Sequence, residues 1–557
     1  MLDPRDIRTG SRIPAENYAD QPFVVVLPDG TWLCVLTTGR GKEGERGQHV
    51  VATRSTDQGQ TWSKPVDIEP ADGPEASWAV PLLVPGGRVY AFYDYNGDRV
   101  EALKGRKIRA DMLGWYVYKY SDDGGRTWSP GRRRLPMRLT ACDRANQWEG
   151  RVQVFWGVSK PIVAGASAYF AFTKLGRYLL DQGEGWVWRS DNILTESDVS
   201  KLRWEMLPEG DAGIRAPEFG SVQEEHNLVA LSDGALYGAY RTTTGCPCFS
   251  ISRDGGRTWS KPEVMAYADG RKMKNPRANP RLWRTAGGKY LFWYHNHGGK
   301  TFEDRNPAWV AGGVEKDGRI LWSEPEVLLY APDPKTRMSY PDLVEQDGRY
   351  WVTETQKSAA RVHEVDGTLL EGLWNQFENR RVAERGLALN LAAGRSGAGA
   401  AVALPRLPHL GQGGGFSLDV WLHLGTPGRP RTILDARDDA GRGIALLVSE
   451  SDRPSLVLGD GRTTAVWEGD EGSLAGEGWR HVVATVDGGP KIITFIVDGR
   501  LCDGGEARPF GWGRFDAAMG DVNGRREVRL GEALGGLRIY GRCLRTSEAA
   551  GNFRAGR

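Results

Sequence analysis

Two histidines and six cysteines are the side chains whose types and spacing could hold a metal ion or do redox chemistry. His295 and His297 end an apolar run two residues apart, so on a strand they share one face and could bind sugar hydroxyls, donate a proton or ligate a metal. No third ligand accompanies them, so we favour substrate contact over a metal site, with a purely structural pair as the alternative. The cysteines show neither a zinc spacing nor a disulfide framework: Cys34, Cys142, Cys246, Cys248, Cys502 and Cys543. We therefore expect no metal and no cofactor.

The 21 tryptophans offer a second chemistry, because their ring faces can stack on sugars, although most are expected to fill spaces between sheets. The chain has 73 basic and 71 acidic residues, a net charge of +2. Such a balance argues against a nucleic-acid binder that works by bulk charge. A glycan is therefore the expected partner, and the oligomeric state is left open.

The 557 residues exceed what one hydrophobic core holds, which predicts two or three domains. No run approaches the roughly 18 apolar residues of a membrane span, so no membrane contact is expected. The start, Met1-Leu2-Asp3-Pro4-Arg5, lacks the apolar core of a secretory signal. The sequence as given predicts a cytoplasmic protein, with a secreted or periplasmic one as the alternative if its start is trimmed.

Three copies of the pattern Ser-x-Asp-x-Gly-x-Thr-Trp, at 55–62, 121–128 and 252–259, indicate how the chain is organised. In such a turn Asp accepts backbone N–H groups, Gly takes a positive φ, Thr bonds back and Trp covers the corner. The aspartates lie 66 and 131 residues apart, so one repeat between them lacks the pattern. A remnant follows at 317–322.

Repeats of about 65 residues built from short strands predict radially arranged sheets, and hence an all-β fold with a six-bladed β-propeller. We assign this propeller to residues 1–385 and expect the N-terminal segment to close the ring as an outer strand of the last blade. From about Gly386 the pattern changes, and 416–422 and 493–499 alternate with period two. This alternation predicts half-buried strands, and hence a second all-β domain over 386–557.

The repeated pattern resembles the Asp-box, or BNR repeat, of the sialidase (neuraminidase) superfamily. The Asp-box is a structural turn away from the active site and also occurs in propellers that are not sialidases, so it speaks for the fold rather than the function. The segment 386–557 resembles a laminin-G or concanavalin-like domain, which implies a β-sandwich jelly roll. Such a domain could bind carbohydrate or only pack against the catalytic propeller.

The segment 338–344 resembles the sialidase segment that carries a nucleophilic tyrosine. The resemblance implies Tyr340 as nucleophile, Glu225 as its base and Glu354, at the end of the next strand, as a further site residue. A phenol needs such a base because its reference pKa is about 10. It is useful because a neutral oxygen can approach an anomeric carbon beside a carboxylate, and tyrosine nucleophiles are a known exception to the two-carboxylate rule.

Sialidases hold the substrate carboxylate with three arginines, and the resemblance implies Arg241 and Arg305 for two of them. Arg337, close to the nucleophile segment, is expected to contact substrate as well. Guanidinium groups suit this role because each can bind a carboxylate through two hydrogen bonds. For each arginine alone, a surface or inter-blade ion pair is the alternative.

Two positions depart from the family. Arg12-Ile13-Pro14 matches the segment that supplies the remaining arginine, but it lies about eight residues too early, and the registered position holds Asp20. The loop 40–49 contains no aspartate to act as the general acid. The candidate acids are therefore Asp20, Glu43 and Glu45. Asp20 could instead bind sugar hydroxyls, and Lys160 could restore the missing cation.

Together these residues predict an enzyme, an exo-sialidase-like glycoside hydrolase. It would release a terminal acidic sugar, sialic acid or a related 2-keto-3-deoxy acid, from glycans by a retaining mechanism with Tyr340 as nucleophile. One alternative is a polysaccharide lyase or non-sialidase hydrolase acting next to a uronic acid, in which Tyr340 or a histidine removes a proton. Another is a non-catalytic protein whose two domains both bind glycan.

Overall fold

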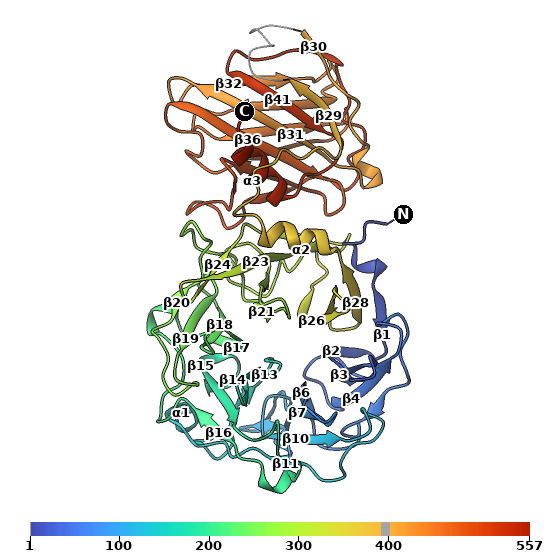
Figure 1. The fold of residues 1–557 in the computed structure, drawn as a ribbon, viewed down its shortest axis with the longest axis vertical. Helices are drawn as coiled ribbons and strands as arrows, with labels where there is room; N and C mark the ends of the chain where they lie inside the picture. The colour runs from blue at the N-terminus through green and yellow to red at the C-terminus, as the bar shows by residue number, and fades with distance from the viewer. Residues whose placement is uncertain (1, 392–400) are drawn as a thin grey trace.

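The computed structural model describes residues 2–391 and 401–557, and strands dominate it (Figure 1). This part of the chain contains three α-helices, α1 (Ala141–Ala145), α2 (Gly367–Trp374) and α3 (Thr546–Ala555). The predicted all-β class is therefore confirmed. Among the helices described, none has both the length and the apolar character to cross a membrane.

Six antiparallel sheets occupy residues 11–365, a range described throughout, and lie around a common centre (Figure 1). In hydrogen-bonding order, the first sheet contains β2 (Tyr18–Val26), β3 (Trp32–Gly39), β4 (His49–Ser55) and β5 (Val66–Asp67). The second contains β6 (Ala76–Leu83), β7 (Val89–Tyr95), β10 (Trp115–Ser121) and β11 (Arg133–Arg134). The third contains β12 (Phe155–Trp156), β14 (Ser167–Arg177), β15 (Asp181–Ser190) and β16 (Glu205–Leu207), with β13 (Ile162–Ala164) beside β14. A hairpin of β8 (Ala102–Leu103) and β9 (Arg106–Lys107) leaves the second.

The other three sheets continue the ring. They contain β17 (Gln223–Ala230), β18 (Leu236–Thr242), β19 (Cys248–Ser252) and β20 (Glu263–Val264); β21 (Arg281–Arg284), β22 (Tyr290–Tyr294), β23 (Ala308–Lys316) and β24 (Arg319–Trp322), with β25 (Glu326–Leu329) beside β23; and β26 (Ser339–Gln346), β27 (Arg349–Thr355), β28 (Ala360–Val365) and β1 (Ser11–Ile13). The pairing of β1 with β28 joins the N-terminal segment to the last sheet as an outer strand, as expected. It also places Arg12 opposite Arg361, on an outer strand rather than on the strand β2 that carries Asp20.

The repeated turns have the chemistry predicted for them. In the first, Thr61 N and Ser55 Oγ donate to Asp57 Oδ1 at 2.9 and 2.8 Å, and Trp62 Nε1 donates to Gly59 O at 3.1 Å. Gly59 has φ +82°, and a Cβ there would lie 2.9 Å from the Trp32 ring, so only glycine fits. The turns around Asp123 and Asp254 repeat the two bonds to the aspartate. Trp259 Nε1 also donates to Gly256 O, at 3.0 Å, whereas Trp128 Nε1 has no partner among the described residues.

Residues 387–391 and 401–555 form two facing sheets, with α3 near the chain end. One contains β29 (Leu387–Leu391), β41 (Leu534–Tyr540), β31 (Phe416–Leu424), β36 (Gly478–Asp487), β37 (Ile492–Val497) and β38 (Arg500–Leu501), with β39 (Trp512–Arg514) beside β37. The other contains β32 (Arg431–Asp435), β33 (Gly443–Val448), β34 (Pro454–Gly459) and β35 (Thr464–Glu468), and a separate pair joins β30 (Ala401–Ala403) to β40 (Glu527–Arg529). The alternating residues of β31 explain the packing, because Leu418 and Val420 point into the core shared by both sheets.

An apolar contact joins the C-terminal sheets to the ring. Trp309 and Trp322 of the ring belong to one buried cluster with Ile492, Ile496 and Trp512 of the C-terminal sheets. Because this cluster is continuous with the core of the fifth sheet, the two parts are docked firmly rather than tethered by a linker.

Candidate active site

The innermost strands β2, β6, β17 and β26 share one irregularity. Each contains a β-bulge, and in each bulge one residue adopts a left-handed conformation: Gln21 (φ +53°), Trp78 (φ +63°), Glu225 (φ +57°) and Tyr340 (φ +46°). A bulge turns a side chain out of the regular alternation of its strand. Such a conformation in a non-glycine residue costs about 1–3 kcal/mol and tends to be kept where a site needs it. The four bulges face the centre of the ring, and we therefore take the region between them as the candidate site.

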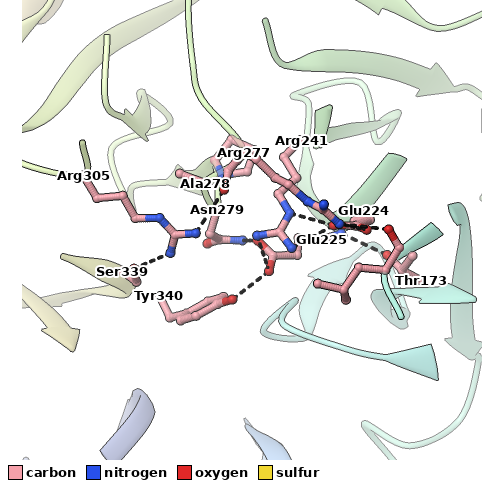
Figure 2. Close-up of polar contacts among 12 residues, drawn as sticks. Thr173, Glu224, Glu225, Arg241, Arg277, Ala278, Asn279, Arg305, Ser339 and Tyr340 are labelled. Carbon is pink, nitrogen blue, oxygen red and sulfur yellow. Dashed lines mark hydrogen bonds and ion pairs between the residues drawn. The ribbon is translucent and has the colours of Figure 1, made fainter. Parts of the chain in front are cut away.

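Tyr340 and Glu225 meet across this centre (Figure 2). Tyr340 Oη donates a hydrogen bond of 2.7 Å to Glu225 Oε1, and the two residues are only 5% and 2% exposed. Burial, and then the neighbouring Glu225 carboxylate, raise the pKa of Tyr340 well above its usual value. The phenol is therefore neutral, and its proton already points at a carboxylate that can accept it.

Three neighbours fix the Glu225 carboxylate and backbone. Arg241 Nη1 lies 2.8 Å from Oε1, Asn279 Nδ2 donates to Oε2 at 3.1 Å, and Glu225 N donates to Thr173 Oγ1 at 3.0 Å. Arg241 comes from β18, Thr173 from β14, and Asn279 from the segment before β21, so the three partners belong to three different parts of the ring. The carboxylate therefore cannot rotate away from Tyr340 without losing a charge-assisted bond.

Three guanidinium groups surround this pair. Arg241 also binds Glu224 through Nε and Nη2 at 2.9 and 2.7 Å, and Arg277 Nη2 binds the other oxygen of Glu224 at 2.8 Å. Within the described part of the chain, Arg305 has only uncharged hydrogen-bond partners, Ser339 Oγ at 2.7 Å and the carbonyl of Arg277 at 3.0 Å. Its Nε is buried without a hydrogen-bond partner among the described residues. Burial lowers the pKa of Arg305.

The charges in this cluster do not balance. Two carboxylates face three guanidinium groups and a neutral phenol, which leaves one excess positive charge. The ring of Phe302, which is partly exposed, lies against all three arginines, with its centroid 4.6 Å from the Cζ of Arg277 and 5.7 and 5.8 Å from those of Arg241 and Arg305. A buried excess of positive charge favours an anionic group, and Phe302 shields it from water.

A second charged group lies on the other side of the Tyr340 ring. Lys357 Nζ stands 4.3 Å from the ring centroid and binds Asp20 Oδ2 at 2.7 Å and Glu43 Oε1 at 3.3 Å. Burial raises the pKa of Asp20 despite the ammonium group beside it. Although burial opposes ionisation of Glu43, Lys357 and Arg109 lower its pKa to about 2. Of the two carboxyl groups, Asp20 is therefore the one able to hold a proton.

Other residues expected in the site lie at its edge or outside the cluster. The Glu45 carboxylate is exposed and, among the described residues, accepts only from Lys42 N, at 2.9 Å. Arg337 is exposed and pairs with Glu303. Lys160 binds Asp342 Oδ2 at 2.7 Å, so its charge is already matched.

Glu354 and the two histidines are also engaged elsewhere. Glu354 lies 3.1 Å from His363 Nε2 and bonds to Gln356, away from the arginines. The ring of His295 is buried, with Nδ1 3.3 Å from the carbonyl of Pro307. The ring of His297 stacks on Phe510 of the C-terminal sheets, with centroids 4.4 Å apart. In the described residues neither ring bonds to Tyr340 or Glu225, and burial, followed by the nearby Arg305 guanidinium, lowers the pKa of His295. In the described residues no group of three or more His, Cys, Asp and Glu gathers to hold a metal ion.

Four site residues that lie outside strands were missed in the sequence. Arg277 and Asn279 lie before β21, Lys357 lies in the turn between β27 and β28, and Phe302 lies in the loop between β22 and β23. None belongs to a repeated pattern or a strand, so neither spacing nor alternation indicated them. The exchange of the expected arginine for Asp20 was the available signal for Lys357, because a buried acid requires a partner.

Comparisons with known proteins agree with the repeated turns. The sequence model of the BNR repeat-like domain matches residues 71–352, about half of the chain, and that of the BNR/Asp-box repeat matches 53–64. The model of the concanavalin A-like lectin/glucanases superfamily matches 396–550. The comparison with curated proteins gives no match.

Three solved structures show what the chain is similar to. A protein of unknown function from Dyadobacter fermentans is 16% identical, with 64% of this chain and 98% of that one covered and a TM-score of 0.48. Trypanosoma rangeli sialidase in complex with sialic acid is 13% identical, with coverages of 98% and 96% and a TM-score of 0.44. The intramolecular trans-sialidase from Ruminococcus gnavus, in complex with oseltamivir carboxylate, is 14% identical, with coverages of 66% and 99% and a TM-score of 0.46.

Proposed function

The chain belongs to the BNR repeat-like domain family, and from the cluster that it carries we propose that it is a retaining exo-glycosidase. Its substrate is a glycan with a terminal acidic sugar, sialic acid or a related 2-keto-3-deoxy acid. The observation that carries this proposal is the 2.7 Å bond from Tyr340 Oη to Glu225 Oε1 among three arginines. A buried phenol bonded to a carboxylate and surrounded by guanidinium groups suits a reaction that uses the phenol oxygen beside a negative group.

The architecture supports the same proposal. We interpret the six sheets as the six blades of a propeller and residues 386–557 as a separate jelly roll, with the boundary after residue 385. In this arrangement the bulged strands β2, β6, β17 and β26 direct side chains from different blades into one central site.

The proposed first step forms a bond at Tyr340. As its oxygen attacks the anomeric carbon, the phenol proton passes to Glu225, and the glycosidic bond breaks with its electron pair moving to the leaving oxygen. Water then attacks the same carbon and passes a proton to the carboxylate that protonated the leaving oxygen, while the bond to Tyr340 breaks and Glu225 returns its proton to the phenol oxygen. Two displacements at one carbon retain its configuration.

The three arginines are proposed to bind the substrate's carboxylate. Arg305 contributes most, because it has no anionic partner in the described chain and one of its buried donors is unpaired. Arg241 and Arg277 already share Glu224, so a substrate carboxylate uses their remaining donors. The excess positive charge of the cluster gives the anion its binding energy.

Asp20 is the proposed general acid. Its pKa is raised by burial, whereas that of Glu43 is about 2 and Glu45 faces solvent. A carboxyl group that keeps its proton at higher pH can protonate the leaving oxygen. When Asp20 carries a proton, Lys357 is matched by Glu43 alone.

The test is release of methylumbelliferone from its sialic acid glycoside by the wild type and by Tyr340→Phe. We expect turnover in the wild type and its loss in the variant, with Tyr237→Phe, another buried tyrosine, unchanged as the control. Loss of activity in both variants, or in neither, would overturn the assignment of Tyr340.

The exchange of the family's arginine for Asp20 is an observation that also favours a second candidate, an enzyme acting next to a uronic acid. If the wild type releases no sialic acid, uronic-acid polysaccharides are the next substrates. A lyase among them is recognised by the ultraviolet absorbance of its unsaturated product. Binding without turnover of either substrate would instead identify a glycan-binding protein.

A further inference from the structure

One loop of the ring lies between the candidate site and the C-terminal sheets. Residues 295–307 connect β22 to β23 without a strand or helix of their own, and they carry both Phe302 and Arg305. A loop of this length has no internal ladder to fix it, so its conformation depends on what it touches.

The C-terminal sheets hold this loop near both ends. Trp512 Nε1 donates to the carbonyl of Asn296 at 3.1 Å, and Gly298 N donates to the carbonyl of Pro509 at 2.8 Å. Arg514 Nη2 bonds to the carbonyl of Asn306 at the other end. These contacts come from one short segment, 509–514, that leads into and forms β39.

His297 carries this contact from the C-terminal sheets into the loop. Its ring lies parallel to that of Phe510, with centroids 4.4 Å apart and an angle of 12°. Gly299 N donates to His297 Nδ1 at 3.2 Å, so Nδ1 is an acceptor and Nε2 carries the hydrogen that Asp304 O accepts at 2.8 Å. Burial lowers the pKa of His297 to about 4, so this neutral form persists at neutral pH.

The residue after Asp304 is Arg305, which reaches the site. Its Nη1 donates to Ser339 Oγ at 2.7 Å, next to Tyr340, and Phe302 lies against all three guanidinium groups. A continuous chain of contacts thus runs from the ring of Phe510 through His297 and Asp304 to the guanidinium group of Arg305.

We propose that the segment 509–514 of the C-terminal domain is a positioning element of the active site, and that Phe510 and Trp512 hold the loop 295–307 in the conformation that presents Arg305 and Phe302 to the substrate's carboxylate. The C-terminal domain then has a role in catalysis that does not require it to bind glycan. The statement about substrate rests on the function proposed above, whereas the statement about the loop does not.

The test uses the full chain and two readouts, hydrogen exchange of the amides in 295–307 and the steady-state constants for the sialic acid glycoside. The variants are Phe510→Ala and Trp512→Phe, with Phe510→Tyr as the conservative replacement. Arg545→Ala is the matched control, because Arg545 bonds to Thr368 and Asp366 across the same interface without touching the loop.

In Phe510→Ala we expect exchange in 295–307 to speed up about tenfold or more and KM to rise about tenfold, the effect of one displaced charge-assisted bond, with a smaller change in kcat. Phe510→Tyr should restore both values, and Arg545→Ala should leave both near those of the wild type.

The outcomes separate this proposal from the proposed function. If the variants show faster exchange of the loop but the wild type turns over no sialic acid glycoside, the positioning role of 509–514 is supported and the proposed function is contradicted. Unchanged exchange and unchanged KM in both Phe510→Ala and Trp512→Phe overturn the positioning role. Equal effects in Arg545→Ala would also overturn it, since any loosening of the interface would then suffice.

Discussion

Replacing Asp20 by asparagine tests the choice of general acid. The amide keeps an acceptor for Tyr18 Oη and Lys357 Nζ, which lie 2.8 and 2.7 Å from the carboxyl group, so the local structure should persist. It cannot give up a proton. A general acid contributes about 10²–10⁴-fold to rate, equivalent to about 3–5 kcal/mol of barrier.

The leaving group decides how much of that loss appears. Methylumbelliferone departs as a stable anion and needs little protonation, so Asp20→Asn should lose less than about tenfold in kcat/KM with that substrate. With a sialylated oligosaccharide as substrate, the leaving group without protonation is an alkoxide, so the same variant should lose about 10²-fold or more in kcat/KM. Because Asp20 must be protonated to act, activity of the wild type on the oligosaccharide should fall as pH rises through its raised pKa, and the variant should lack this limb.

Glu45→Gln is the matched control for this comparison. The Glu45 carboxylate is exposed and accepts from Lys42 N, so its loss should leave activity with both substrates near that of the wild type. Equal losses with both substrates in Asp20→Asn, or a dependence on the leaving group in Glu45→Gln as large as in Asp20→Asn, would refute the reasoning.

Three further predictions concern charged groups in the site, beside the third sheet and at the interface with the C-terminal sheets. Glu225→Gln should lower kcat about 10²-fold or more while the chain stays folded, because Glu224 still binds Arg241; turnover and thermal unfolding check this. Lys174→Met should lower the free energy of unfolding by about 3–5 kcal/mol in urea titrations, since it leaves the carboxylate of Asp143 buried and unpaired. Burial raises the pKa of Glu324 from 4.5 to about 7, so the folded chain holds the extra proton and unfolding free energy should fall as pH rises across that window. Glu324→Gln should flatten this dependence, and a wild-type curve already flat there would contradict it.

Local chemistry explains why the sequence predicted much of the fold. The turns around Asp57 need only residues within eight positions of one another, so their bonds could be stated in advance. The outer-strand role of the N-terminal segment followed from the need to close a ring. Tyr340 and Glu225 were indicated by resemblance, yet the bulges that turn them toward each other have no sequence pattern of their own.

The remaining parts of the site depend on contacts between distant segments. Lys357 and Arg277 act from irregular segments, and their positions follow from the packing of neighbouring sheets rather than from periodicity. His297 appeared to be a substrate contact because the sequence could not show Phe510 stacked on its ring. Lys160 was expected to act as a substitute cation, and in the structure its ammonium group forms an ion pair with the carboxylate of Asp342.

The central claim is that Tyr340 forms a covalent bond to the sugar. A fluorinated sialic acid that slows breakdown of the intermediate should add one sugar to the protein, and digestion followed by mass spectrometry locates it. The account predicts an adduct on Tyr340 in the wild type and none in Tyr340→Phe. An adduct on another residue, or inversion of configuration at the anomeric carbon of the released sugar, would contradict it.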